Sequence, residues 1–251
     1  MEQAARTAIV TGAGKRVGAE IARALVADGW RVIAHVRTDG DTVTEGAVKV
    51  AADLADPGCA AAIFAAAAGL PPVRLLVNNA ARFAWDGLGS FDCAEFDAHM
   101  AVNVRAPLLL IEALAAAHES GEALVVNLLD SKLAAPNPDF LSYTLSKQAL
   151  AGATELAARA LAPRGIRVNG IAPALMLRSA GQSEENFRTM QRANPLRQAV
   201  EPGDVVAALR YLVGARSVTG QVLTIDGGQR FWSLDRDVQY LSPSDVGGGE
   251  R

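Results

Sequence analysis

The stretch from Arg6 to Gly29 reads RTAIVTGAGKRVGAEIARALVADG and decides the fold. Its first six residues form a short apolar run rich in β-branched side chains, which is typical of a buried parallel strand. From Val17 onward apolar residues recur at helical spacing, and Gly29 ends that helix. The glycines of residues 12–18 lie between strand and helix. A doubly wound sheet binds a dinucleotide at this position, because glycines let the backbone approach a pyrophosphate at the helix N-terminus.

The rest of the chain continues the same alternation of strand and helix. Further strands are predicted at 31–36, 47–51, 73–77, 123–128, 166–171 and 222–225. Helices are predicted at 57–68, at 92–117 with an interruption near Pro107, from about Tyr143 to 162, and at 201–213. The alternation predicts one α/β domain over residues 1–232, with a seven-stranded parallel sheet and helices on both faces. The polar, Gly-rich tail 233–251 is expected to end in about ten disordered residues.

Composition narrows the function. Half of the 251 residues are hydrophobic, and the net charge is -3. This slightly acidic balance does not favour binding to nucleic acid. The sequence contains no run of 18 apolar residues, so no membrane span is predicted. The residues before the first strand do not have the pattern of a signal peptide. The two cysteines and three histidines lack metal-ligand spacing, so no metal site is expected. Reduced thiols and the missing signal favour a cytoplasmic protein that acts on a small molecule.

The end of the second strand indicates which dinucleotide binds. An acidic residue there would accept the ribose 2′-hydroxyl of NAD, whereas this strand is followed by Arg37. A guanidinium matches phosphate geometry, and Lys15 and Arg16 add positive charge nearby. This pattern favours NADP(H). Asp39 and Asp41 are the counter-evidence, and they are interpreted as exposed loop residues.

Tyr143 and Lys147 are the candidate proton-transfer pair. Four residues apart on a helix, they lie on the same face. An ammonium one turn away favours the phenolate, so Lys147 is expected to lower the pKa of Tyr143. The alternative is an ordinary helix with a half-buried Tyr and a surface Lys.

Five motifs in register resemble those of the short-chain dehydrogenase/reductases over residues 6–230. They are Thr11-Gly12-x3-Arg16-x-Gly18, Asn78-Asn79-Ala80, Asn103, Tyr143-x3-Lys147 and Asp226-Gly227-Gly228. The resemblance implies a Rossmann fold in which Tyr143 is the general acid and Lys147 lowers its pKa and binds the nicotinamide ribose. It also implies that Asn103 holds a relay water. The residues expected at the cofactor are Gly12, Lys15, Arg16, Val17, Gly18, Arg37, Asp53, Leu54, Asn79, Ala80, Tyr143, Lys147 and Pro173.

Two departures from the family pattern point to one branch. Arg16 replaces a glycine of the loop, and Asp130 stands where the family has its catalytic Ser, thirteen residues before the Tyr. Both features resemble the pteridine reductases, including dihydromonapterin reductases, and Phe83 would supply the aromatic ring that stacks on a pterin. Ala81 departs from that branch, where a hydroxyl residue is common. The residues then expected at the substrate are Arg16, Phe83, Asp130, Tyr143 and Leu175, under a loop spanning 175–195.

These observations predict an NADPH-dependent reductase of a pterin-type substrate, with Asp130 and Tyr143 managing the proton. Two alternatives remain open at the site: Ser131 takes the role of the family Ser, or Phe83 is ordinary packing. With Ser131 in that role, the protein would be a carbonyl reductase acting on a 3-oxoacyl or other ketone substrate. A non-catalytic NADPH-binding protein is a third possibility. The resemblance further implies a homotetramer.

Overall fold

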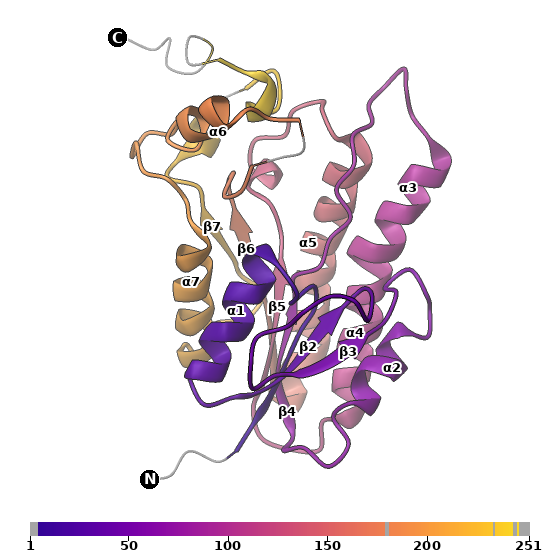
Figure 1. Ribbon diagram of the computed structural model, residues 1–251. Coiled ribbons are helices and arrows are strands. Elements are labelled where there is room, and N and C mark those ends of the chain that lie inside the picture. The colour runs from indigo at the N-terminus through magenta and orange to yellow at the C-terminus, as the bar shows by residue number, and fades with distance from the viewer. Residues whose placement is uncertain (1–4, 179–180, 233, 243–244, 246–251) are drawn as a thin grey trace.

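The computed structural model describes residues 5–178, 181–232, 234–242 and 245 (Figure 1). Most of the predicted disordered end lies outside these residues. The described residues form one parallel sheet between two layers of helices, with a smaller group of elements beyond the carboxyl ends of the strands.

All seven predicted strands are present, and the prediction of one parallel sheet is confirmed. The sheet has the order β3-β2-β1-β4-β5-β6-β7, and every neighbouring pair is parallel. The strands are β1 (Thr7–Val10), β2 (Arg31–Val36), β3 (Val48–Ala51), β4 (Val73–Asn78), β5 (Ala123–Leu128), β6 (Ile166–Pro173) and β7 (Val222–Ile225). The strand order reverses between β1 and β4, where open α/β sheets bind their ligands.

Two apolar layers cover the sheet. Ala8 and Val10 of β1 point to one face, and Ile9 between them points to the other, as the two-residue period of a strand requires. The first face is covered by α1 (Arg16–Ala27) and α7 (Pro202–Gly214). The second is covered by α2 (Cys59–Ala65), α4 (Ala106–Ala117) and α5 (Leu141–Leu161) (Figure 1). These layers hold β1, β4 and β5 at the centre, so the ends of the central strands are fixed in space.

The predicted 92–117 helix is a composite of three segments. It consists of α3 (Cys93–Met100), a π-helical turn at Ala101–Arg105 and α4, which starts beside Pro107. By length and composition alone, the composite could cross a membrane, although it contains no run of 18 apolar residues. Leu110, Ile111 and Leu114 are buried in the protein core, as in the core helix of a globular domain.

Two elements differ from the sequence prediction. Helix α2 is shorter than the predicted 57–68 segment, since the Asp56 side chain accepts from Gly58 N in a turn before the helix. The loop predicted at 175–195 contains α6 (Glu184–Met190), which Ser183 caps by accepting from Asn186 N at 3.1 Å. Ser183 followed by two glutamates is a helix-start signal that the sequence analysis missed.

Candidate active site

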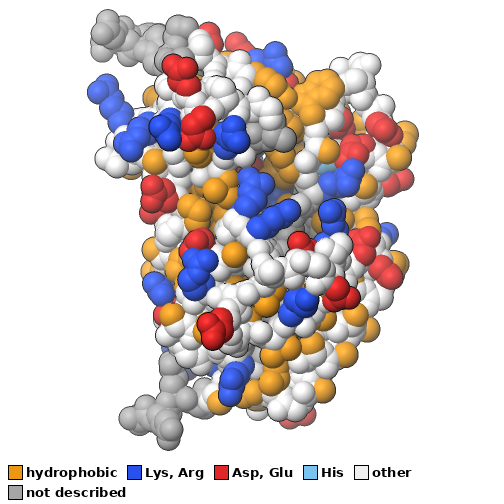
Figure 2. Space-filling model, in the orientation of Figure 1, with side chains coloured by type: hydrophobic (Ala, Val, Ile, Leu, Met, Phe, Trp, Pro, Cys, Tyr) orange, Lys and Arg blue, Asp and Glu red, His pale blue; other side chains and the backbone are white. Residues whose placement is uncertain are grey.

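A cleft of about 800 Å³ lies at the carboxyl ends of the strands. Its walls come from the loops after each of the strands β1 to β6, and from residues beyond β7. Lys and Arg side chains gather near the middle of the face of the molecule that Figure 2 shows. Every residue predicted at the cofactor or substrate lines this cleft. Asn103, which was expected to hold a relay water, is buried and does not line it.

The glycine loop and α1 pack too closely for any side chain at Gly18. A Cβ there would lie 2.1 Å from the carbonyl oxygen of Gly12, and Gly12 itself has φ +66°. Asn79 fastens the loop from β4, since its Nδ2 donates to Thr11 O at 2.8 Å and its backbone N donates to Thr11 Oγ1. The predicted cofactor residue Asn79 therefore also shapes the loop.

His35 is a loop-positioning residue that the sequence analysis missed. It is buried at the end of β2, where Nδ1 lies 3.2 Å from Gly12 N and Nε2 lies 2.9 Å from Ala52 O. Burial lowers the pKa of His35, so the ring is neutral and Nδ1 can accept from Gly12. A single histidine within an apolar strand gave no sequence signal for this role.

The start of α1 suits an anionic ligand. Lys15 is its N-cap residue, no side chain caps the helix, and no acidic residue lies in its first turn. The free N–H groups of the first turn and the helix dipole therefore favour a phosphate there. Arg16 lines the cleft with φ 55°, a left-handed conformation in the position where glycine is usual.

The edge of the cleft beyond β2 is basic. Lys15, Arg16, Arg37 and Thr38 line it, and Arg37 is exposed. The interpretation of Asp39 and Asp41 as exposed loop residues holds for Asp39 and in part for Asp41, which is a loop residue of intermediate exposure. Asp41 is partly buried in the cleft wall, where its carboxylate accepts from Thr38 N and Oγ1 at 3.2 and 2.9 Å. These bonds lower the pKa of Asp41 and hold its carboxylate on the loop backbone. Asp53 and Leu54 line the same end of the cleft.

Tyr143 is buried near the start of α5, and its hydroxyl donates to Asp130 Oδ2 at 2.7 Å. Burial and the Asp130 carboxylate raise the pKa of Tyr143 well above its ordinary value. The net direction of this pKa shift is opposite to the expected lowering, because burial and a hydrogen-bonded carboxylate act on the phenol. Lys147 Nζ donates to Leu128 O at 2.6 Å and lies 5.7 Å from the centre of the Tyr143 ring. Burial lowers the pKa of Lys147 to about 8.

Asp130, and not Ser131, is the residue hydrogen-bonded to the Tyr143 phenol. Its Oδ1 accepts from Lys132 N at 2.9 Å, which fixes the carboxylate at the start of a 3-10 turn, Ser131–Leu133. Burial raises the pKa of Asp130 against the opposing hydrogen bonds. Ser131 is also buried and lines the cleft, but the Tyr143 hydroxyl is bonded to Asp130.

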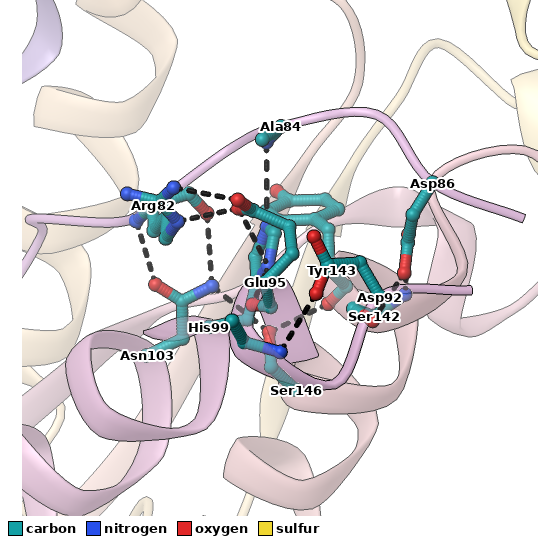
Figure 3. A network of polar contacts seen from close by, with 11 residues as sticks. Arg82, Ala84, Asp86, Asp92, Glu95, His99, Asn103, Ser142, Tyr143 and Ser146 are labelled. Atoms are coloured by element: carbon teal, nitrogen blue, oxygen red, sulfur yellow. Dashed lines mark hydrogen bonds and ion pairs between the residues drawn. The ribbon is translucent and has the colours of Figure 1, made fainter. Parts of the chain in front are cut away.

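Asn103 lies in the π-helical turn between α3 and α4. Its Oδ1 accepts from Arg82 N at 2.7 Å, and its Nδ2 donates to Arg82 O and to Ser146 Oγ (Figure 3). The side chain therefore connects the loop after β4 to α5, one turn from Tyr143. A π-helical turn often marks a functional position, since it redirects one side chain.

Asp86 is a second positioning residue that the sequence did not reveal. Its buried carboxylate accepts from both the backbone N and the Oγ of Ser142 at the start of α5 (Figure 3). Phe140, the N-cap residue of α5, has a left-handed backbone and no capping side chain. Asp86 therefore supplies from a distant loop the cap that Tyr143's own helix lacks.

Phe83 presents a partly exposed ring at the substrate end of the cleft. The ring stacks on Phe140 at 4.4 Å and meets the Tyr143 ring edge-on at 4.7 Å. With 47% of its surface exposed and a place in the cleft wall, it can also contact a ligand. Pro173 at the end of β6 and Leu175 after it line the same cleft.

Comparison with known proteins identifies the family. A family model of short-chain reductases, described as enoyl-(acyl carrier protein) reductase, matches residues 12–230. The chain belongs to the short-chain dehydrogenase/reductases. Among curated members of this family it is similar to carbonyl reductase [NADPH] 2 of Sus scrofa, with 32% identity over 88% of this chain and 95% of the relative. It is also 32% identical to pteridine reductase 1 of Leishmania tarentolae, over 92% of this chain and 98% of the relative.

A solved structure with 35% identity to this chain has the same fold. FolM alternative dihydrofolate reductase 1 from Brucella canis, complexed with NADP, superposes with a TM-score of 0.83. The two share 35% identity over 96% of each chain. The carbonyl reductase and the pteridine reductase thus resemble this chain to a similar degree. Overall sequence identity therefore does not distinguish the two substrate classes.

Proposed function

We propose that this short-chain dehydrogenase/reductase is an NADPH-dependent reductase of a pterin-type substrate. The observation that carries the proposal is the 2.7 Å hydrogen bond from Tyr143 to Asp130. A ketone reductase needs a neutral donor beside the Tyr to bind a carbonyl oxygen. A carboxylate there suits a substrate whose ring nitrogens donate hydrogen bonds or take up a proton.

The residues that line the cleft are suited to NADP(H). The uncapped start of α1 would bind the pyrophosphate, and Lys15, Arg16 and Arg37 would bind the 2′-phosphate. Asp53 and Leu54 would flank the adenine, while Lys147 and Pro173 would lie at the nicotinamide end. When bound, the reduced nicotinamide supplies the hydride for a C=N bond.

The protein side chains manage the proton. The raised pKa of Tyr143 keeps the phenol protonated at neutral pH, which is the form a proton donor requires. Asp130 accepts the phenol hydrogen bond as a carboxylate. After Tyr143 has given up its proton, Asp130 can take up a proton from solvent and pass it to the phenolate. Its own raised pKa brings proton exchange closer to the working pH. Asn103 acts indirectly in this scheme, because its bonds to Arg82 and Ser146 hold the loop and α5 in register.

Phe83 would bind the face of the substrate ring. Stacking a flat heteroaromatic ring on Phe83 contributes about 0.5–1.5 kcal/mol beyond the burial of area. Arg16 and Leu175 border the same space and would contact the ring edge. Holding the ring against the cofactor in this way would account for much of the rate enhancement.

The alternative is a carbonyl reductase that uses Ser131. Two observations support it: Ser131 is in the cleft wall, and carbonyl reductase 2 of Sus scrofa is a relative at 32% identity. In this alternative the hydroxyl of Ser131 would bind the substrate carbonyl after rotation of the Asp130 side chain.

Steady-state assays distinguish the two. We expect NADPH consumption with dihydromonapterin or dihydrobiopterin, and little with a panel of ketones and a 3-oxoacyl thioester. Asp130→Ala should abolish pterin reduction, while Ser131→Ala should retain it. Turnover of ketones alone, or the reverse pattern for the two variants, would establish the carbonyl reductase instead.

We further propose a cytoplasmic homotetramer. Leu108 of α4 and Leu145 and Leu156 of α5 are large apolar side chains that are 40% or more exposed. Large exposed apolar side chains on two helices that contact each other are suited to a subunit interface. Sedimentation of the purified protein tests the oligomeric state.

A further inference from the structure

A segment beyond β7 forms one wall of the substrate end of the cleft. Residues 234–241 are called here the C-terminal strap, and Leu234, Asp237 and Val238 of the strap line the cleft. The strap lies beside α6 in Figure 1, and Asn186 Nδ2 of α6 donates to Leu241 O at 2.8 Å. The strap therefore connects the substrate end of the cleft to α6.

The strap is anchored on a buried carboxylate. Asp139 is 6% exposed and accepts both Arg236 Nε and Nη2, at 2.8 and 3.0 Å. It also accepts from Asp237 N at 2.8 Å. Tyr240 stacks on Phe140 with ring centres 6.2 Å apart and an interplanar angle of 13°. A bidentate guanidinium on a buried carboxylate holds a fixed geometry, so the wall formed by the strap is preorganised.

Asp237 faces Lys132 across the end of the cleft. Lys132 Nζ donates to Asp237 Oδ2 at 3.1 Å and to Asp139 O at 2.8 Å, and both paired side chains are only 11% and 14% exposed. These two bonds use two of the three ammonium N–H groups. Asp237 Oδ1 accepts Gln239 N at 3.2 Å, which leaves lone pairs on the carboxylate. The pair thus offers a donor directly beside an acceptor.

The pair lies close to the reacting groups. Lys132 is two residues from Asp130, which accepts its backbone N–H. The negative charge of Asp237 contributes to the raised pKa of Tyr143, so its carboxylate acts on the same site. A donor beside an acceptor complements a planar edge in which a ring carbonyl adjoins an N–H, as in a lactam.

We propose that Lys132 and Asp237 form a subsite for the lactam edge of the substrate ring, so that the C-terminal strap determines substrate specificity. Lys132 donates to the ring carbonyl, and Asp237 accepts from the neighbouring ring N–H. The inference rests on the proposed reduction of a flat nitrogen heterocycle, and it adds which edge of that ring the protein recognises and from which segment.

The test compares Asp237→Asn and Lys132→Met with Asp235→Asn. Asp235 is an exposed strap residue outside the cleft wall, so its variant makes the same charge change without touching the subsite. The measurements are the Kd of oxidised pterin from its fluorescence, the Kd of NADPH, and kcat/KM for dihydrobiopterin and for a ketone without a lactam edge. Thermal unfolding of each variant checks that it is folded. If Asp237→Asn does not fold, Lys132→Met alone tests the subsite.

We expect the Kd of pterin and the KM of dihydrobiopterin to rise at least tenfold in both subsite variants. The Kd of NADPH and the KM of any ketone that is turned over should stay at wild-type values, because neither is bound through the lactam edge, and all properties of Asp235→Asn should be unchanged. Unchanged pterin affinity in folded subsite variants of an enzyme that reduces dihydrobiopterin overturns the subsite and leaves the proposed function intact. A wild-type enzyme that neither binds pterin nor reduces dihydrobiopterin overturns both.

Discussion

The Tyr143 hydroxyl and Asp130 Oδ2 lie 2.7 Å apart, although the two residues belong to different elements. Asp130 follows β5, and Tyr143 is in the first turn of α5. The carboxylate therefore replaces a neutral hydroxyl as the nearest partner of the phenol. This exchange reverses the expected direction of the Tyr143 pKa shift, and it determines how activity should depend on pH.

Asp130→Asn should move the alkaline limb of the pH–activity profile to lower pH. The Asp130 carboxylate raises the pKa of Tyr143 and also raises that of Lys147, which burial alone would lower further than about 8. Without the negative charge both pKa values fall, so the phenol proton and the ammonium are each lost at lower pH. A charge at this distance shifts a pKa by about 1–3 units, and a limb shift of at least about one unit is expected.

The measurement is kcat/KM against pH for the wild type and Asp130→Asn, at whatever residual rate the variant retains. Ser131→Ala, which changes the neighbouring residue without changing charge, should leave the position of the limb unmoved. A limb that stays in place in Asp130→Asn would show that neither group sets it.

Asp86→Ala should lower kcat and stability together. Removing the buried acceptor leaves Ser142 N and Oγ unpaired at the start of α5, a loss of about 1–3 kcal/mol in the free energy of unfolding. Since Tyr143 is the next residue, its phenol is expected to shift, and kcat should fall at least about tenfold. The Kd of NADPH should change little, because the glycine loop lies on other elements.

Asp92→Ala provides the matched control for Asp86→Ala. Asp92 caps α3 by accepting from Ala94 N at 2.8 Å, so its loss should cost about 0.5–2 kcal/mol of stability. Since α3 does not carry Tyr143, kcat should stay near the wild-type value. If both variants lose stability and neither loses kcat, Asp86 is only a helix cap.

Sequence patterns predicted the fold because each strand and helix is encoded locally. Ile9 between Ala8 and Val10 shows why: a short apolar run with both faces buried can be only a central strand of a covered sheet. Helix α6 was missed because it has seven residues and few apolar ones, so its capping signal at Ser183 was the only local evidence.

The candidate site was predictable where function depends on local motifs and unpredictable where it depends on distant contacts. The lining role of Gly12 was expected from the glycine-loop pattern, and that of Phe83 and Lys147 from the resemblance of their local motifs to the family. The contacts of Asp86 with Ser142 and of Asp237 with Lys132 span 56 and 105 residues. No local pattern encodes such contacts. The misjudged pKa of Tyr143 has the same origin, because the effect of Asp130 depends on a distance that only the folded chain defines.

Gly18→Ala should weaken cofactor binding. The new methyl carbon would lie 2.1 Å from Gly12 O and 2.5 Å from Asn79 Nδ2, and the first of these is backbone that cannot turn away. Either α1 or the loop must move, at a cost of about 1–3 kcal/mol. The start of α1 would then no longer face the pyrophosphate, and the Kd of NADPH should rise more than tenfold.

Gly203→Ala separates this contact from a general effect of alanine in a helix. Gly203 lies in the first turn of α7, and a Cβ there would meet no atom within 4 Å. This variant should bind NADPH normally and gain up to about 1 kcal/mol of stability. Titration of NADPH fluorescence and thermal unfolding measure both effects. Normal NADPH binding by Gly18→Ala would mean that the loop tolerates the shift.

Arg37→Ala should reduce the preference for NADPH over NADH. Arg37 is exposed at the edge of the cleft beside Lys15, and no acidic residue at the end of β2 replaces it as a ribose ligand. A charge-assisted hydrogen bond to a phosphate contributes about 1.5–3 kcal/mol, so kcat/KM for NADPH should fall about 10–100-fold. The value for NADH, which has no 2′-phosphate, should be unchanged.

Arg31→Ala is the control for Arg37→Ala, since Arg31 is an exposed arginine at the opposite end of β2, away from the cleft. It removes the same charge and should leave both coenzyme constants at wild-type values. Equal losses for NADPH and NADH in Arg37→Ala would place the guanidinium at a part of the coenzyme that the two share. A loss confined to NADPH, weaker at high salt, would identify Arg37 as a ligand of the 2′-phosphate, because salt screens an exposed pair of charges.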